Sequence, residues 1–169
     1  LKKWGRISEN TNKCLNSLIS TKTGFETEVV ITGNAGEHAM SMPLAEILPF
    51  ASGYAVESQE LISLFENFGG ILPTKESKVI EQGIDILQIE TRNPHLHEER
   101  GNLHLNEILL SSMSTIYHSP LCDKKVKQAI LAELNNQGIL KDGESPLPVH
   151  INSPLRNVKV NKFVNAIRN

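Results

Sequence analysis

The 169-residue chain has little cysteine, few aromatic side chains and no excess of one charge. Its two cysteines, Cys14 and Cys122, are far apart and lack the spacing of a zinc finger. We therefore expect two buried, reduced thiols rather than a metal finger or a disulfide scaffold. Aromatic residues make up only 5%, too few to suggest a surface that stacks single-stranded nucleic acid. With 17 Lys+Arg against 19 Asp+Glu there is no basic field, so we expect no nucleic-acid partner.

Long apolar runs are also missing. No stretch approaches the roughly 18–20 apolar residues that span a bilayer, so we expect a soluble chain without a membrane partner. No cleavable signal is visible in the first residues, which favours a cytoplasmic location. The sequence starts with Leu1 rather than Met, and we expect it to be a fragment of a longer protein.

What is present suffices for one folded domain, with 39% hydrophobic and 21% charged residues. Segments with a helical apolar period outnumber short β-branched runs, which predicts an α/β fold with more helix than strand. Ser8, Ser58 and Asp123 are expected N-caps. The expected helices are 8–20, 42–48, 59–68, 102–116, 124–137 and 160–167. The expected strands are 28–31 and 84–89, with a short strand or extended turn at 51–56.

The first candidate site is Gly5-Arg6-Ile7-Ser8 at a helix start. The first N–H groups of a helix carry partial positive charge, and glycine lets an anion approach the backbone. Arginine adds a bidentate fork and serine a hydroxyl, so the segment could hold a phosphate or a carboxylate. A capped helix beside a surface arginine is the simpler interpretation, and these residues alone favour it.

Two further segments combine turn residues with polar side chains. Residues 32–39, Thr-Gly-Asn-Ala-Gly-Glu-His-Ala, could form a ligand-binding turn or an ordinary strand–helix connection. Residues 52–57 end in Glu57, just ahead of a helix. Such a carboxylate could accept a hydrogen bond from a substrate hydroxyl, or simply lie favourably against the helix dipole.

The densest cluster of ionisable residues lies in residues 91–98, directly after the expected strand 84–89. His95 and His97 would lie on one side of an extended chain, a workable arrangement for a divalent metal. Pro94 holds the residue before it extended. Two histidines with arginine and glutamate nearby favour function over a structural role.

Taken together, these segments resemble the C-terminal half of the mannosyl-3-phosphoglycerate synthases, retaining glycosyltransferases of the GT-A type. Four motifs carry the resemblance in fixed order, and it extends through Ile116-Tyr117-His118-Ser119. The Gly-Asn-Ala-Gly-Glu-His turn and the Asn-Pro-His-x-His element are typical of the mannosyl branch. The four motifs are residues 4–12, 32–40, 50–57 and 88–98.

The resemblance implies where the acceptor, 3-phosphoglycerate, binds. The family's Gly-Arg-x-Ser/Thr segment binds its phosphate, which corresponds to Gly5, Arg6 and Ser8, with Asn12 a weaker candidate one turn later. The glutamate of the family's Gly-Tyr-x-Val-Glu element lies by the glycerate, which corresponds to Glu57.

The resemblance also implies a cofactor and a donor. A divalent cation such as Mg²⁺ is shared in the family between an Asp-x-Asp motif, the diphosphate of GDP-mannose and one histidine of the C-terminal half. That histidine corresponds to His95 or His97, and Asn34 is expected near the reaction centre together with Glu57.

One departure from the family pattern concerns the donor site. The family's Asp-x-Asp motif belongs to its N-terminal half, and no Asp-x-Asp occurs in this chain. We therefore expect residues 1–121 to be the acceptor- and metal-binding part of a GT-A catalytic domain, and 122–169 a C-terminal helical extension. The expected activity, mannosyl transfer from GDP-mannose to 3-phosphoglycerate, belongs to the parent protein, and the fragment alone could be inactive.

The sequence is also compatible with two alternative functions. The parent could use a glucosyl donor, like the related glucosyl-3-phosphoglycerate synthases. Alternatively, the chain could be a non-catalytic metal- or anion-binding module in which Arg6, His95 and His97 have structural roles. A homodimer is one assembly we consider.

Overall fold

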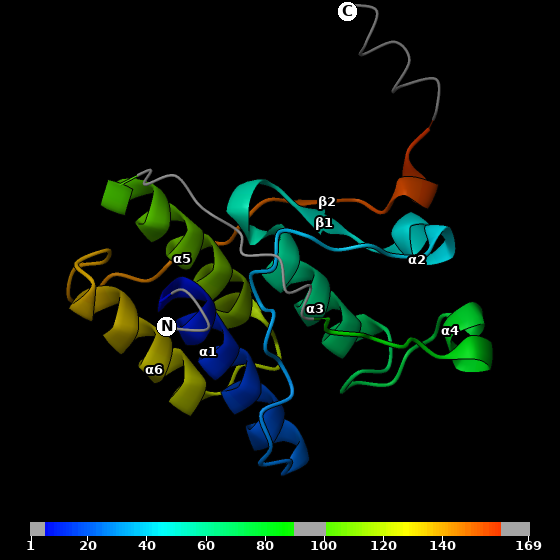
Figure 1. The fold of residues 1–169 in the computed structure, drawn as a ribbon, viewed down its shortest axis with the longest axis horizontal. Coiled ribbons are helices and arrows are strands. Elements are labelled where there is room, and N and C mark those ends of the chain that lie inside the picture. Colours follow the sequence, from blue (N-terminus) through cyan, green and yellow to red (C-terminus); the bar gives the residue numbers. More distant parts are fainter. Residues whose placement is uncertain (1–5, 90–100, 160–169) are drawn as a thin grey trace, which may run out of the picture.

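The computed structural model describes residues 6–89 and 101–159, together with the side chains of all these residues except 6, 101 and 102. The described residues form six α-helices, two short 3-10 helices and one antiparallel pair of two-residue strands (Figure 1). The α-helices are α1 (Arg6–Thr23), α2 (Met42–Ile47), α3 (Val56–Asn67), α4 (Ser77–Gln82), α5 (Gly101–His118) and α6 (Lys124–Asn136). The other elements are β1 (Phe50–Ala51), η1 (Gly53–Ala55), β2 (Ile151–Asn152) and η2 (Leu155–Asn157). None of these helices is long and apolar enough to cross a membrane.

The predicted helices within the described residues are confirmed; α2 and α6 start as predicted, and α1, α3 and α5 start one to three residues earlier. The side chain of Asp123 caps α6 by accepting from the Val126 amide at 2.9 Å, as predicted. Ser8 and Ser58 are not caps, because α1 and α3 each begin two residues before them. The short helix α4 was not predicted, since its six residues hold too few apolar positions to show a period.

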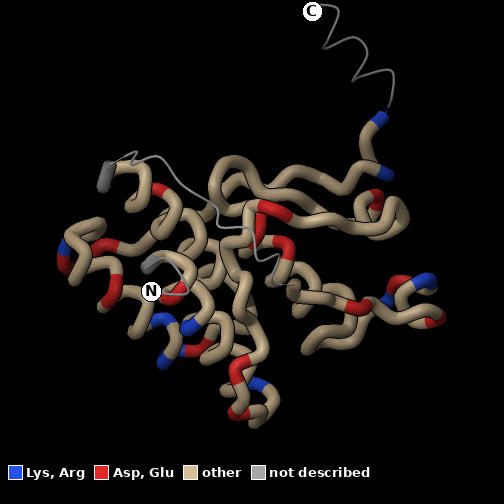
Figure 2. Tube along the Cα trace, viewed as in Figure 1, with Lys and Arg blue, Asp and Glu red and all other residues tan. Residues whose placement is uncertain are grey.

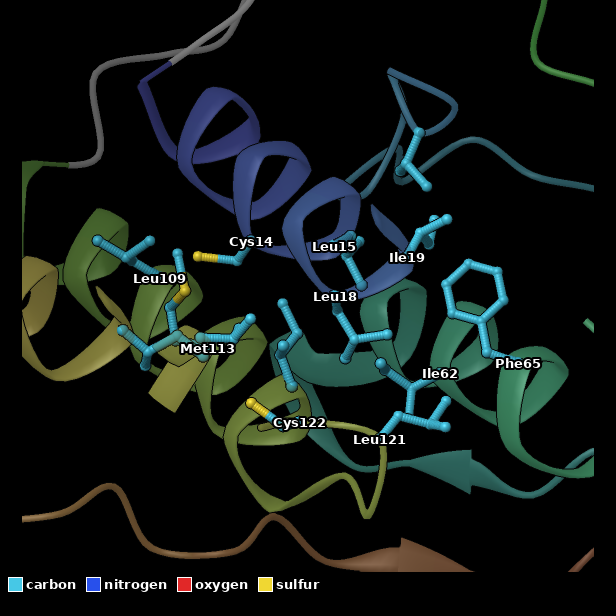
Figure 3. Close-up of a cluster of buried hydrophobic side chains, with 14 of the residues drawn as sticks. Cys14, Leu15, Leu18, Ile19, Ile62, Phe65, Leu109, Met113, Leu121 and Cys122 are labelled. Carbon is cyan, nitrogen blue, oxygen red and sulfur yellow. The ribbon is translucent and has the colours of Figure 1, made fainter. Parts of the chain in front are cut away.

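The main core lies between α1, α3, α5 and α6 (Figure 3). Each helix presents one apolar stripe to the others, which is why a helical apolar period predicts the core-facing side. The α6 stripe joins this same core, and the predicted division at residue 121 stays a prediction. The most deeply buried members are Leu15, Leu18, Ile62, Leu109, Met113, Ile116, Ile130 and Leu134.

Both cysteines are reduced and buried in this core, as predicted. Burial raises the pKa of Cys14 to about 12 and that of Cys122 to about 11. Both thiols are therefore protonated near neutral pH and behave as small apolar side chains.

The predicted strand 28–31 is wrong, and so is the predicted strand 84–89. Both segments run outside any described helix or sheet, although both sequences are rich in β-branched and other apolar residues. A strand requires a neighbouring strand to receive its backbone hydrogen bonds, and the described part of the chain offers none beside them. For residues 29–32, the side-chain oxygens of Asn16 and Gln88 accept the hydrogen bonds of the backbone amides instead.

The last described segment returns along α5 to the start of α3. His118 Nε2 lies 2.8 Å from the Pro146 carbonyl, and the Ser114 hydroxyl donates to the Leu147 carbonyl. β2 then pairs with β1, immediately before η1 and α3. The Gly-Tyr-x-Val-Glu motif is thereby fixed from two directions, by α5 and by the returning chain. The predicted tail helix 160–167 lies outside the described residues.

Candidate functional site

The turn at residues 32–38 lies between α1, α3 and α5, and hydrogen bonds tie it to two of these helices. The amide of Ala35 donates to the Thr32 carbonyl at 3.0 Å and closes the turn. Asn12, on α1, accepts from the Gly33 amide through Oδ1 at 2.8 Å in a buried contact. Asn34 Nδ2 donates to Ser112 Oγ of α5 at 2.6 Å. The predicted catalytic residue Asn34 is therefore held between two core helices.

Gly33 is required by this close approach. A Cβ at this position would lie 2.8 Å from Asn12 Oδ1 and 2.9 Å from a methyl group of Leu15. Both distances are shorter than real Cβ contacts allow, and both neighbours belong to the packed face of α1. The first glycine of the motif thus serves packing, because it lets the turn lie directly on α1.

Two glutamates project from the start of α3 toward the turn. The backbone of the turn passes Glu57 so closely that a Cβ on Gly36 would lie 3.7 Å from Glu57 Oε1. Glu60 follows three residues later, on the same helix face, and is buried. Acidic positions at the start of α3 stand out in the charge distribution (Figure 2). The positive end of the helix dipole favours carboxylates in this first turn.

Glu60 faces His38 of the turn, whose Nε2 lies 3.2 Å from Glu60 Oε1. Burial raises the pKa of Glu60, and the nearby Glu57 carboxylate raises it further, while His38 acts in the opposite direction. Burial is the largest of these effects, so the net direction is upward. The turn and α3 therefore bring two carboxylates and one imidazole together in a polar cluster.

The polar groups at and around this cluster suit a ligand with several hydroxyl groups. The Oδ1 atom of Asn34 is buried and has no hydrogen-bond partner among the described residues. Glu57 is half-buried at the same turn, so its carboxylate can accept a hydrogen bond. Tyr54 of η1 and His104 of α5 add an edge-to-face aromatic pair, with ring centroids 4.9 Å apart, ahead of α3. Acceptors of this kind can orient a sugar or a hydroxy acid.

The structure places the remaining predicted site residues as follows. Arg6 begins α1, and its side chain lies outside the described part; Ser8 is half-buried in the first turn of that helix. Asn12 is buried, and its Oδ1 accepts the hydrogen bond of the Gly33 amide. Gly5, His95 and His97 lie outside the described residues, so their roles stay predictions. Among the described residues there is no group of three or more side chains that could hold a metal ion.

Sequence reasoning noticed His38 as a polar residue of the turn but did not identify Glu60 or Ser112. The spacing of Glu57 and Glu60 could have indicated a shared helix face. No local signal identifies Ser112, because it meets Asn34 only through the packing of α5.

The packing of the turn on α1 can be tested with Gly33→Ala. The added methyl group would collide with Asn12 and Leu15, and we expect a loss of about 1–3 kcal/mol in the free energy of unfolding. Urea denaturation followed by circular dichroism measures it. Gly36→Ala is the matched control, since its Cβ meets only an ordinary contact, and it should leave stability unchanged. Equal stability of both variants would contradict the close approach.

The buried carboxylate predicts a pH dependence. Because the pKa of Glu60 is raised above its ordinary value of 4.5, the folded chain holds this proton more tightly than the unfolded chain. Stability is therefore lost as pH rises from about 4.5 through the raised pKa. Glu60→Gln removes this loss, so we expect a higher Tm than wild type at neutral pH, and no such gain well below that window.

Thermal melts at several pH values measure this effect. Glu81→Gln, an exposed change on α4, is the control and should follow wild type throughout. A Glu60→Gln variant that is less stable than wild type at neutral pH would mean that the contact with His38 outweighs the cost of burial.

Comparison with known proteins assigns the chain to a family. The family model described as mannosyl-3-phosphoglycerate synthase matches residues 1–167. The chain is 48% identical to the mannosyl-3-phosphoglycerate synthase of Pyrococcus furiosus over 169 residues, which cover 99% of this chain and 43% of that protein. It is 36% identical to the enzyme of the same name from Aeropyrum pernix over 146 residues, 86% of this chain and 38% of that protein. The chain thus spans less than half the length of these relatives, and it belongs to the mannosyl-3-phosphoglycerate synthase family.

Proposed function

We propose that the full-length protein transfers a mannosyl group from GDP-mannose to the 2-hydroxyl of 3-phosphoglycerate, with retention at the anomeric carbon, on a catalytic domain of the GT-A type. The observation that carries this proposal is the family match over residues 1–167, which includes the turn at 32–38 and the start of α3. We propose that this chain supplies the acceptor side and that GDP-mannose binds to the part of the protein that the chain does not span. The location of the full-length protein would be the cytoplasm, where both substrates occur.

In this proposal the start of α1 receives the phosphate of the acceptor. The free N–H groups of its first turn offer partial positive charge, to which Arg6 adds a bidentate fork and Ser8 a hydroxyl, with Gly5 allowing close approach. Asn12 supports this arrangement indirectly. Its hydrogen bond to Gly33 joins α1 to the turn, so the phosphate end and the turn would keep a fixed separation.

Glu57 and Asn34 are proposed to orient the rest of the acceptor. The Glu57 carboxylate would accept the hydrogen bond of the glycerate hydroxyl, and Asn34 would use its unpartnered Oδ1. Holding that hydroxyl close to the anomeric carbon lowers the barrier by positioning, an effect that reaches roughly 7–11 kcal/mol at the extreme. No described side chain is an obvious nucleophile toward the sugar.

A divalent cation such as Mg²⁺ is part of the proposal, with His95 or His97 as its ligand. The described residues do not by themselves provide a metal site. When bound, such a cation would neutralise charge on the departing diphosphate. A homodimer also stays a proposal.

Donor competition tests the function directly. The full-length protein, given 3-phosphoglycerate with GDP-mannose, GDP-glucose or UDP-glucose in turn, should use GDP-mannose with a kcat/KM at least about tenfold higher, a difference of about 1.4 kcal/mol in transition-state binding. The 169-residue chain alone should give no turnover, because it has no Asp-x-Asp motif. Turnover with a glucosyl donor and none with GDP-mannose would replace this proposal by the glucosyl alternative.

Arg6→Ala in the full-length protein tests the acceptor site. Loss of the bidentate partner should raise the KM for 3-phosphoglycerate at least about tenfold and leave the KM for GDP-mannose nearly unchanged. Lys13→Ala is the matched control, because it removes one positive charge from the exposed side of the same helix. An equal rise in both KM values would mean that Arg6 does not contact the acceptor.

A further inference from the structure

Three hydroxyl side chains are buried where α3 meets α5. Ser58, at the start of α3, and Ser112 of α5 are fully buried, and Thr115 of α5 is 4% exposed. A buried hydroxyl costs free energy unless it is hydrogen-bonded, and serine and threonine form helices less readily than alanine. Apolar side chains would fill the space between two packed helices at lower cost, so packing alone does not explain these hydroxyl groups.

Ser112 and Thr115 connect α5 to two different parts of the candidate site. The Ser112 hydroxyl accepts from Asn34 Nδ2 at 2.6 Å. Thr115 Oγ1 lies 3.1 Å from Ser58 Oγ in a buried contact. Ser58 follows Glu57 directly in the chain. One helix is therefore hydrogen-bonded both to the turn that carries Asn34 and to the residue beside Glu57.

The two hydroxyl groups of α5 lie on one face of the helix. Ser112 and Thr115 are three residues apart, which corresponds to about 4.5 Å along the helix axis. Thr115 Oγ1 also lies 2.7 Å from the Ser112 carbonyl, so the two residues are joined within the helix. A hydrogen bond weakens steeply when its distance or angle changes. These contacts therefore define the separation of the turn and the start of α3 more narrowly than apolar packing does.

The contact with Ser112 satisfies only one end of the Asn34 carboxamide. Nδ2 is hydrogen-bonded to Ser112, whereas Oδ1 is buried and has no partner among the described residues. A buried acceptor without a partner costs free energy, and a purely structural asparagine has both ends satisfied. This arrangement is typical of a side chain that is held at one end and offers the other end to a ligand.

We propose that Ser112 and Thr115 are positioning residues, which hold Asn34 and Glu57 at the separation that the glycerate part of the acceptor requires. Ser112 acts through Asn34, and Thr115 acts through Ser58 on the backbone that carries Glu57. The inference rests on the proposed function, in which Asn34 and Glu57 orient the acceptor.

Removing each hydroxyl group in the full-length protein tests this inference. Ser112→Ala and Thr115→Val should each lower kcat at least about tenfold, because a small displacement of a positioned group is costly in rate. The KM for GDP-mannose should stay nearly unchanged, since neither residue lies on the donor side in the proposal. Thr115→Ser keeps the hydroxyl group and should retain most of the wild-type kcat. Ser112→Cys keeps the volume but hydrogen-bonds only weakly, so it should show the same fall as Ser112→Ala if the latter does not fold.

Ser63→Ala is the matched control. Ser63 is fully buried in α3, and its hydroxyl accepts from Gln59 Nε2 at 2.9 Å. It follows Glu57 by six residues, about 9 Å along the helix axis. The control should lower Tm by a few degrees, like the Ser112 and Thr115 variants, but should keep the wild-type kcat. An equal fall of kcat in the control would mean that lost stability, and not lost positioning, causes the effect, and would overturn the inference.

Double variants separate a positioning role from a structural one. Ser112→Ala should cause no further fall of kcat in an Asn34→Ala background, because the residue through which it acts is already absent. Thr115→Val should likewise lose its effect on kcat in a Glu57→Gln background. A full additional fall in either background would show that the hydroxyl group acts independently of its partner, which contradicts the inference.

The same measurements distinguish this inference from the proposed function. A wild-type protein that transfers no sugar to 3-phosphoglycerate would overturn the proposed function and the inference with it. A wild-type protein that performs the transfer, with Ser112→Ala and Thr115→Val variants that keep its kcat, would leave the proposed function standing and overturn the inference alone.

Discussion

Five consecutive backbone amides, those of residues 29–33, donate to three side-chain oxygens rather than to a strand. Asn16 receives the first two, Gln88 the next two and Asn12 the last. Buried or partly buried amides must have partners, and in this chain carboxamide side chains supply them. The position of the turn at 32–38, and with it that of Asn34, depends on these side-chain hydrogen bonds.

This dependence explains which parts of the fold could be predicted from the sequence. Helices satisfy their backbone groups within one segment, so an apolar period and a cap such as Asp123 suffice to predict them. Strands need a partner from elsewhere, and the composition of residues 28–31 and 84–89 could not reveal that none is present among the described residues. The errors at these two segments thus have a physical cause, which is that strand formation is not a local property.

The candidate site shows the same division between local and non-local information. Glu57 and Asn34 were identified because their types and their places beside glycines suggest ligand chemistry. Glu60 was not, because its burial and its contact with His38 arise only in the folded chain. The raised pKa of Glu60 is therefore a property of the assembled turn, and no reading of residues 56–60 alone could supply it.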